Sequence, residues 1–228
     1  MKNYKLHLIR HFATEEGLEG KYLGNTDHHI AMESKFALEE KLEESCYPPC
    51  DIIYSSPALR CLETAQLLYP DQETVICDQM AELDFGDFEG KTVAELKDNE
   101  DYKAWLLDSL NNPIPNGEDM SLFIARLYKG LDLIFKDMCR REANEAVLIT
   151  HGGVIMTMLS AFGVPRQPIS KWLTKSAEGY TILLNPQMWL RDNLFEIYSK
   201  VPFSKEDLFD SWHSERFQGF DGFDDEEI

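Results

Sequence analysis

The chain has 228 residues, of which 43% are hydrophobic and 11% are aromatic. This composition is typical of a globular protein and excludes a disordered or fibrous chain. The 41 acidic residues outnumber the 22 basic ones, which gives a formal net charge of −19. A surface of that sign repels nucleic acid and anionic membranes, so we expect neither as a partner. Two or three arginines can still bind one phosphate group locally.

The cysteines and the N-terminus both bear on the compartment. The five cysteines contain no CxxC pair and lack the pattern of a small secreted framework, which favours a reducing compartment. The run from Met1 to Arg10 alternates polar and apolar residues and has no signal-peptide core. No run approaches the roughly 18 apolar residues that span a membrane. We therefore expect a cytoplasmic protein.

Short apolar or β-rich runs alternate with helical patterns along the chain. Strands are predicted at residues 5–9, 52–54, 75–77, 147–149 and 180–184. Helices are predicted at residues 32–42, 58–68, 122–138 and 154–162, where apolar residues recur at spacings of three and four. This alternation indicates βαβ units, so we predict an α/β fold: a three-layer α/β/α sandwich with a mostly parallel central sheet.

One domain is expected over residues 1–202. Residues 110–119 are rich in proline and glycine and predict a loop ahead of the long helix, within an insertion of about 91–120 that covers the active-site end of the sheet. Residues 203–228 form a tail in which nine acidic and two basic residues are interleaved with aromatic ones. The tail has two interpretations: a solvated surface segment, or aromatic residues that close over a substrate or a partner subunit.

Two histidines directly follow predicted strands. His11 comes after the first strand and His151 after the fourth, while Arg60 lies in the first turn of the helix after the second strand. The carboxyl ends of parallel strands meet at one edge of a sheet, where ligands usually bind. We therefore expect these three segments to converge.

These residue types predict phosphoryl chemistry. A neutral imidazole can attack phosphorus when its other nitrogen donates an orienting hydrogen bond, so His11 is the candidate nucleophile. Arg10, Arg60 and His151 are candidate donors to the phosphoryl oxygens. A leaving alkoxide needs a proton, and Glu82 is the candidate acid. Each residue alone has a common structural explanation, such as a hydrogen-bonded histidine or a solvated arginine. The combination is more specific.

Four segments resemble the motifs of the histidine phosphatase (phosphoglycerate mutase-like) superfamily, in the same order, across residues 5–185. They are Leu8-Ile9-Arg10-His11 with Thr14, Ser55-Ser56-Pro57-Ala58-Leu59-Arg60, Glu82 with Phe85-Gly86-Asp87-Phe88-Glu89-Gly90, and Thr150-His151-Gly152-Gly153. The resemblance implies a phosphorylated His11, a phosphate pocket formed with Arg10, Arg60 and His151, and proton donation by Glu82. It implies no metal and no organic cofactor. It also implies that Glu89 is structural.

Two positions depart from the family's pattern. Phe12 stands where the family usually has glycine, and Gly17 where it often has asparagine. We expect an ordinary backbone conformation at Phe12, with its side chain walling the pocket. Loss of the asparagine side chain is expected to remove one phosphate donor. Thr14, Tyr22 and Thr26 are the further candidates for the substrate pocket.

Neighbouring histidines at 28 and 29 could suggest a metal site. We favour a loop instead, because adjacent histidines rarely share one ion and other ligands are not evident. This loop is expected to lead into a helix that starts near Ile30 and is capped by Asp27.

The separation of Glu82 and His151 is shorter than in the mutases of the family, which favours a phosphatase. We expect a metal-independent phosphomonoesterase that hydrolyses a small phosphorylated metabolite through a phosphohistidine. Residues 22–27 and 178–186 most resemble the α-ribazole phosphatase or broad-specificity branch, so α-ribazole 5'-phosphate, a cobalamin precursor, is one candidate substrate. The alternatives are a phosphoglycerate mutase and a catalytically weak protein that binds phosphate esters. The sequence does not determine the oligomeric state, and a homodimer is one candidate.

Overall fold

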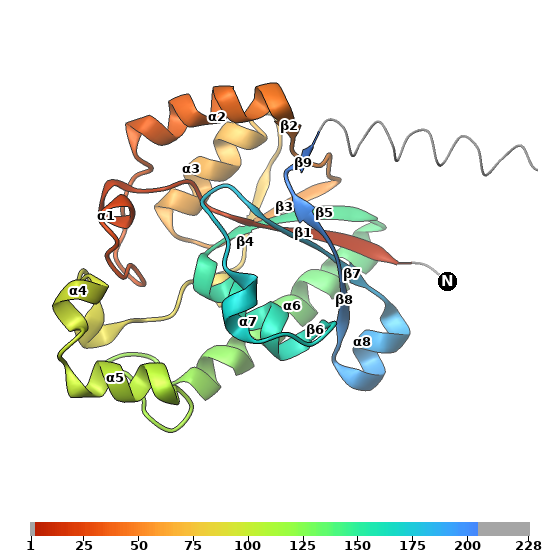
Figure 1. Cartoon of the computed structure of the whole chain (residues 1–228). Coiled ribbons are helices and arrows are strands. Elements are labelled where there is room, and N and C mark those ends of the chain that lie inside the picture. The colour runs from red at the N-terminus through yellow and green to blue at the C-terminus, as the bar shows by residue number, and fades with distance from the viewer. Residues whose placement is uncertain (1–2, 205–228) are drawn as a thin grey trace, which may run out of the picture.

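The computed structural model describes residues 3–204, whose helices and strands are labelled in Figure 1. The strands are β1 (Tyr4–Arg10), β2 (Ser45–Cys46), β3 (Ile52–Ser55), β4 (Thr74–Ile76), β5 (Glu145–Thr150), β6 (Gly163–Val164), β7 (Gly179–Leu184), β8 (Phe195–Val201) and β9 (Phe203–Ser204). The α-helices are α1 (Glu15–Leu18), α2 (Met32–Glu44), α3 (Leu59–Leu68), α4 (Val93–Leu96), α5 (Glu100–Leu107), α6 (Met120–Arg141), α7 (Gly152–Phe162) and α8 (Pro186–Asp192). Three 3-10 turns are η1 (Asp78–Met80), η2 (Gly86–Phe88) and η3 (Ile169–Trp172).

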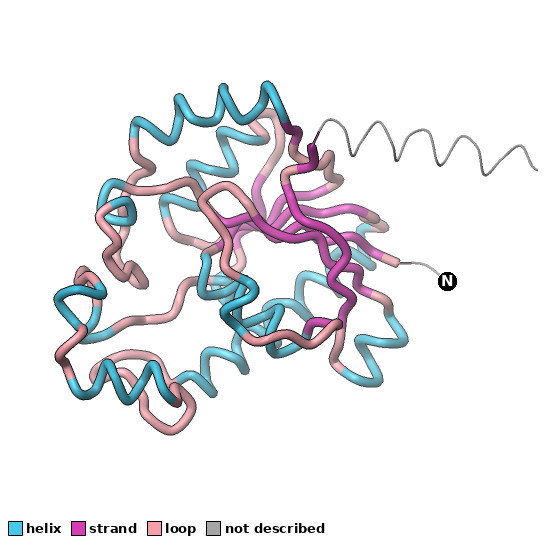
Figure 2. Tube along the Cα trace, in the orientation of Figure 1, coloured by secondary structure: helices cyan, strands magenta, loops and turns pink. Residues whose placement is uncertain are grey.

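Seven strands form the central sheet, in the order β4-β3-β5-β1-β7-β8-β6. β4, β3, β5 and β1 pair in parallel, and β7 runs antiparallel between β1 and β8. Helices lie on both sides of the sheet, with α2 and α3 on one side and α6 and α7 on the other (Figures 1 and 2). The predicted α/β fold with a mostly parallel sheet is confirmed.

The two faces of the sheet bury alternate residues of the same strands. Leu8 of β1 and Leu148 of β5 are fully buried in the cluster that includes α6 and α7. Their neighbours Ile9 and Ile149 are fully buried in a second cluster, which includes α3. A strand buried on both faces has a continuous apolar sequence, and close packing on both faces fixes its position. Arg10 and Thr150 pair at that end of β1 and β5.

Several elements differ from the expectations. β8 was not predicted, because its sequence alternates buried and exposed positions and carries three polar side chains, as an antiparallel strand with one open face does. α4 and α5 lie within the expected insertion, and residues 110–119 follow them without a helix or strand. α2 begins at Met32, whereas Ile30 forms an isolated β-bridge with Thr14.

The tail predictions concern residues that mostly fall outside those described. Phe203 and Ser204 form β9, which pairs with β2, and residues 205–228 lie beyond the described part of the chain. None of the helices within residues 3–204 is long and apolar enough to cross a membrane.

Candidate active site

His11 follows the last residue of β1 and is held by backbone contacts. Its amide donates to Thr150 O at 2.9 Å, which extends the β1–β5 ladder by one residue. Its ring Nδ1 lies 2.6 Å from Phe12 O. A carbonyl can only accept, so Nδ1 carries the proton and Nε2 has the free lone pair. Burial, and after it the charges of Arg60 and Arg10, lower the pKa of His11 to about 3 against the opposing hydrogen bond to Phe12 O, so the ring is neutral.

Arg60 is fully buried in the first turn of α3. Its guanidinium donates to the carbonyl oxygens of Thr26 at 2.9 Å, Gly24 at 3.0 Å and Leu23 at 3.3 Å. The 23–26 loop therefore surrounds Arg60 with neutral acceptors, which orient the guanidinium without cancelling its charge.

Arg10 ends β1 and donates from NH1 to Thr174 O at 2.6 Å. Burial lowers the pKa of Arg10, and the Glu82 carboxylate opposes this shift. The Nε atoms of Arg10 and Arg60 are both buried and have no acceptor within residues 3–204. Buried donors without a partner are rare, and a bound phosphate would supply the acceptors for two such arginines.

His151 lies beside His11, with 5.2 Å between the ring centroids. Its Nδ1 is 3.2 Å from the NH2 group of Arg60, and its Nε2 is 2.7 Å from Ser56 Oγ. A guanidinium can only donate, so Nδ1 accepts and the proton sits on Nε2. Burial lowers the pKa of His151 well below its usual value, and His11 lowers it further. His151 can donate to a phosphoryl oxygen only if Nε2–H turns away from Ser56.

Glu82 lies in the segment between η1 and η2, outside any helix or strand. Its Oε1 accepts from the Leu83 amide and its Oε2 from the Gly153 amide, each at 2.9 Å. Burial raises the pKa of Glu82, while these two amides and the two arginines Arg60 and Arg10 oppose the rise. A carboxyl group of this kind holds a proton more readily than an exposed one, as an acid catalyst must.

Two glycines begin α7, one beside Glu82 and one beside Arg10. A Cβ on Gly153 would lie 2.4 Å from Glu82 Oε1, far inside van der Waals contact. A Cβ on Gly152 would lie 3.4 Å from Arg10 Cζ, an ordinary contact. Gly153 is therefore needed for the approach of Glu82 to the N-terminal end of α7, whereas Gly152 is not strictly required.

Glu89 fixes the loop that surrounds Arg60. Its carboxylate accepts from the Gly24 amide at 2.8 and 2.9 Å, and from the Thr26 hydroxyl at 2.7 Å. A Cβ on Gly24 would lie 2.1 Å from Leu83 O, so only glycine allows this close approach to the Glu82 segment. The expectation of a structural role for Glu89 fits these contacts.

The four candidate pocket residues use their side chains in internal contacts. Phe12 has no positive φ, and its ring is buried in a cluster with Ile30, Leu38 and Ala177. The Thr14 hydroxyl caps α1 by accepting from the Gly17 amide at 3.0 Å. Tyr22 shares a 2.8 Å hydrogen bond with the Tyr102 hydroxyl, and Thr26 donates to Glu89.

Packing favours glycine at position 17. A Cβ at position 17 would lie 3.0 Å from Thr14 Oγ1, so an asparagine there would crowd the cap of α1.

The prediction that Asp27 caps the helix starting near Ile30 is wrong. Its Oδ1 accepts from the amide of Leu59, the first residue of α3, at 3.0 Å. It therefore caps the helix that carries Arg60.

The adjacent histidines contact different carboxylates. His28 Nδ1 lies 3.0 Å from Glu16, and His29 Nδ1 lies 2.6 Å from Glu63. Among the side chains that the structure describes, no three of His, Cys, Asp or Glu gather in a way that could hold a metal ion.

Residues that sequence reasoning did not assign hold the site in place. Thr64 Oγ1 accepts from the Phe12 amide at 2.9 Å and donates to Arg60 O at 2.7 Å, which links β1 to α3. On the other side of the sheet, Arg126 of α6 donates to the backbone of the Glu82 segment. The one available signal was that Arg126 falls next to Leu127 on the buried stripe of an amphipathic helix.

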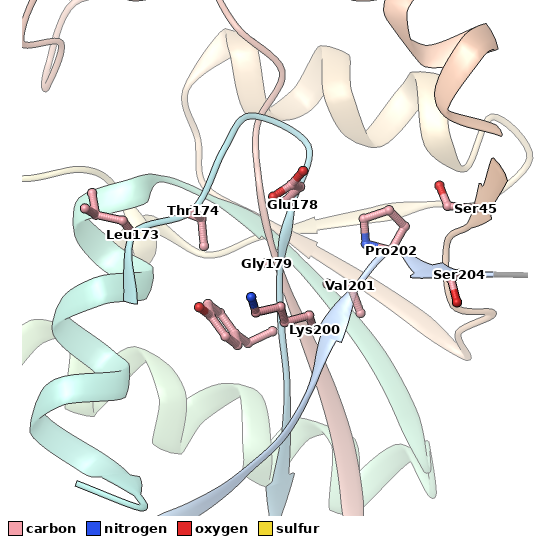
Figure 3. Close-up of a pocket in the computed structure, with 10 residues that line it drawn as sticks. Ser45, Leu173, Thr174, Glu178, Gly179, Lys200, Val201, Pro202 and Ser204 are labelled. Atoms are coloured by element: carbon pink, nitrogen blue, oxygen red, sulfur yellow. The ribbon is translucent and has the colours of Figure 1, made fainter. Parts of the chain in front are cut away.

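A cavity of about 380 Å³ lies beside the segment that holds Arg10 (Figure 3). It opens at the ends of β7 and β8, and its wall includes Thr174, whose carbonyl binds Arg10. Its lining residues are Ser45, Leu173, Thr174, Glu178, Gly179, Tyr180, Lys200, Val201, Pro202 and Ser204. The cavity is thus next to the candidate active site, but His11 and Glu82 do not line it.

The structure brings the five principal candidates together: His11, Arg10, Arg60, His151 and Glu82. A neutral imidazole with a free Nε2 lies beside two buried guanidinium groups and a carboxyl group with a raised pKa. Such a set can attack a phosphorus atom, stabilise the charge on its oxygens and protonate a leaving group.

Comparisons with known proteins show the family to which the chain is similar. The model of the histidine phosphatase superfamily (branch 1) matches residues 6–190. Phosphoserine phosphatase 1 of Hydrogenobacter thermophilus is 26% identical over 67% of this chain and 72% of its own length. Adenosylcobalamin/alpha-ribazole phosphatase of Salmonella typhimurium is 25% identical over 68% of this chain and 78% of its own. The crystal structure of the alpha-ribazole phosphatase from Shigella flexneri aligns with a TM-score of 0.69 at 20% identity, covering 86% of this chain and 95% of that one.

Proposed function

Because this chain belongs to the histidine phosphatase superfamily, we propose that it is a metal-independent phosphomonoesterase that works through a phosphohistidine at position 11. The observation that carries the proposal is the hydrogen bond from His11 Nδ1 to Phe12 O, which leaves Nε2 as the nucleophilic atom. The neutral state of the buried imidazole supports the same role, since a protonated ring could not attack.

In the first step, His11 Nε2 attacks phosphorus and a P–N bond forms while the bond from phosphorus to the leaving oxygen breaks. Arg10 and Arg60, each with an unpartnered buried Nε, bind the phosphoryl oxygens as charge gathers on them. Glu82 gives its proton to the leaving oxygen, and the alcohol departs.

In the second step, a water molecule attacks phosphorus and loses a proton to the Glu82 carboxylate. The P–N bond breaks, its electron pair returns to Nε2, and inorganic phosphate is released. One carboxyl group thus acts first as the acid and then as the base, and the raised pKa of Glu82 suits both tasks near neutral pH.

We further propose a small phosphorylated metabolite as the substrate. Two relatives at about one quarter identity are named phosphoserine phosphatase and adenosylcobalamin/alpha-ribazole phosphatase, and phosphoserine and α-ribazole phosphate are small phosphomonoesters. Parallel assays of these two esters, with 3-phosphoglycerate included, separate the candidate substrates. Release of phosphate from one of them with a clearly higher kcat/KM supports the assignment. Isomerisation of the phosphoglycerate without phosphate release contradicts it.

The test of the reaction class is His11→Ala, assayed with 4-nitrophenyl phosphate in the presence of a chelator. We expect a loss of activity of about 1000-fold or more, because the nucleophile is removed. His29→Ala, which removes an exposed imidazole, is the matched control and should retain full activity. Undiminished hydrolysis by His11→Ala contradicts the proposed mechanism.

A further inference from the structure

One side chain binds most of the backbone that carries Glu82. Arg126 of α6 donates from NH1 to Gln79 O at 2.8 Å and to Ala81 O at 2.7 Å, and from NH2 to Glu82 O at 2.8 Å. β4 ends at Ile76, so this segment has no strand pairing that could fix it. Between the backbone hydrogen bonds of Cys77 and of Asp84, its position depends on side-chain contacts, and those from Arg126 are the most extensive described for it.

Glu118 fixes the orientation of Arg126. Its Oε1 accepts from Arg126 Nε at 2.6 Å and its Oε2 from NH2 at 2.8 Å, a two-point contact that sets the plane of the guanidinium. The Phe123 ring lies 4.6 Å from Arg126 Cζ and covers one face of the group. Both side chains of the pair are largely buried, with 23% and 18% exposed.

The Arg126–Glu118 pair uses the full capacity of a guanidinium. An arginine has five N–H donors, and the structure gives each of them an acceptor: three backbone carbonyls and two carboxylate oxygens. A lysine has only three donors on a single atom, so it cannot reproduce this geometry.

The same pair reaches the other side of Glu82. The Glu118 amide donates to Asp84 O at 3.0 Å, so the backbone is tied to the pair both before and after the acid. Glu118 neutralises Arg126 directly, and Arg126 touches the carbonyl of Glu82 but not its carboxylate. The pair therefore acts on where the acid lies.

We propose that Arg126, oriented by Glu118, is a positioning residue that places Glu82 for proton transfer to the leaving group. The inference rests on the proposed role of Glu82 as the acid. Its consequence is selective: esters whose alcohol cannot leave without a proton need the Arg126–Glu118 pair, whereas esters of acidic phenols do not.

The experiment compares kcat/KM of Arg126→Gln for an alkyl phosphate and for 4-nitrophenyl phosphate. This constant covers the steps up to departure of the leaving group, so it isolates the protonation. We expect a loss of about 100-fold for the alkyl ester, the cost of a misplaced catalytic group, and little change for the aryl ester. Equal losses for both esters would overturn the proposal, because a smaller fraction of folded enzyme lowers both alike.

Milder variants keep the test decisive if Arg126→Gln does not fold. Arg126→Lys retains the charge, and Glu118→Gln retains the arginine but weakens its orientation. Both should show the same preference for the aryl ester, with losses for the alkyl ester of about 10-fold. Arg140→Gln is the matched control: it removes an exposed arginine of the same helix that pairs with Asp137, and should leave both constants unchanged.

A double variant separates this inference from the proposed function. In a Glu82→Gln background the acid is already lost, so adding Arg126→Gln should have no further effect on the alkyl ester. A further loss as large as in the wild type would overturn the positioning role while leaving His11 as nucleophile. Full activity of His11→Ala would instead remove the proposed function itself.

Discussion

The end of β1, which carries Arg10 and His11, is held by the backbone pairing of a sheet, whereas the segment that carries Glu82 is held mainly by side chains. The first is fixed by sheet pairing to Thr150 and by buried neighbours on both faces. The second has no strand and depends on Arg126 and on the glycines that let it approach α7. The nucleophile side should therefore tolerate changes around it, while the acid side should respond to single distant substitutions.

Gly153→Ala tests the contact between α7 and the Glu82 carboxyl group. The new Cβ would lie 2.4 Å from Glu82 Oε1, so the carboxyl group must move away from α7. We expect a loss in kcat/KM for an alkyl phosphate of about 100-fold. The midpoint temperature of thermal unfolding should not fall together with the activity, because alanine is more favourable in a helix than glycine by about 1 kcal/mol.

Gly152→Ala is the control for this substitution, since its Cβ would meet Arg10 at the ordinary distance of 3.4 Å. A similar loss of activity in both variants would show that α7, and not the position of Glu82, is what the methyl group disturbs.

Glu89→Gln tests how the loop around Arg60 contributes to phosphate binding. The neutral amide accepts more weakly from the Gly24 amide, so the carbonyls that orient Arg60 should lose their fixed positions. We expect kcat/KM to fall about 10-fold for alkyl and aryl esters alike, mainly through a higher KM. Glu95→Gln, at the cap of α4, is the control. A loss restricted to the alkyl ester would assign Glu89 to the acid side.

A separate effect is expected on stability, and it concerns His7 of β1. Burial lowers the pKa of His7 to about 4, below its unfolded value of 6.5. Between these values the unfolded chain binds a proton that the folded chain does not, so His7 lowers the free energy of unfolding by about 1.4 kcal/mol per pH unit as the pH falls from 6.5 to 4. Above pH 6.5 both states are neutral and His7 has no such effect.

His7→Asn checks this, because the amide can keep the contact with Thr181 Oγ1 but does not titrate. The free energy of unfolding, measured in urea at several pH values, should fall less steeply from pH 6.5 to 4 for this variant than for the wild type. His29→Asn, at an exposed site, serves as control. The same decrease in the free energy of unfolding for the wild type and for His7→Asn would contradict the role of His7.

The sequence predicts the backbone-held side better than the side-chain-held one. β1 and β5 are buried on both faces, so their apolar runs and the histidines that follow them are visible in the sequence. β8 escaped prediction because one face of it is exposed. Arg126 escaped because an arginine within a helix is usually solvated, and the three backbone carbonyls that it binds belong to a segment more than 40 residues earlier in the chain.

Packing gives Phe12 a contact that the sequence does not indicate. Its ring is buried in a cluster with Ile30 and Leu38, and its place beside the substrate stays a prediction. Its amide binds Thr64, so the residue helps to hold β1 against α3.

The most direct test of two separable sides is a rapid-mixing experiment on Glu82→Gln with 4-nitrophenyl phosphate. The phenolate leaves without a proton, so His11 should be phosphorylated, but the variant lacks the base that activates water for the second step. We predict a burst of nitrophenolate equal to one per enzyme, with an acid-labile phosphate that mass spectrometry locates on His11. Absence of the burst, or phosphate on another residue, would contradict the account.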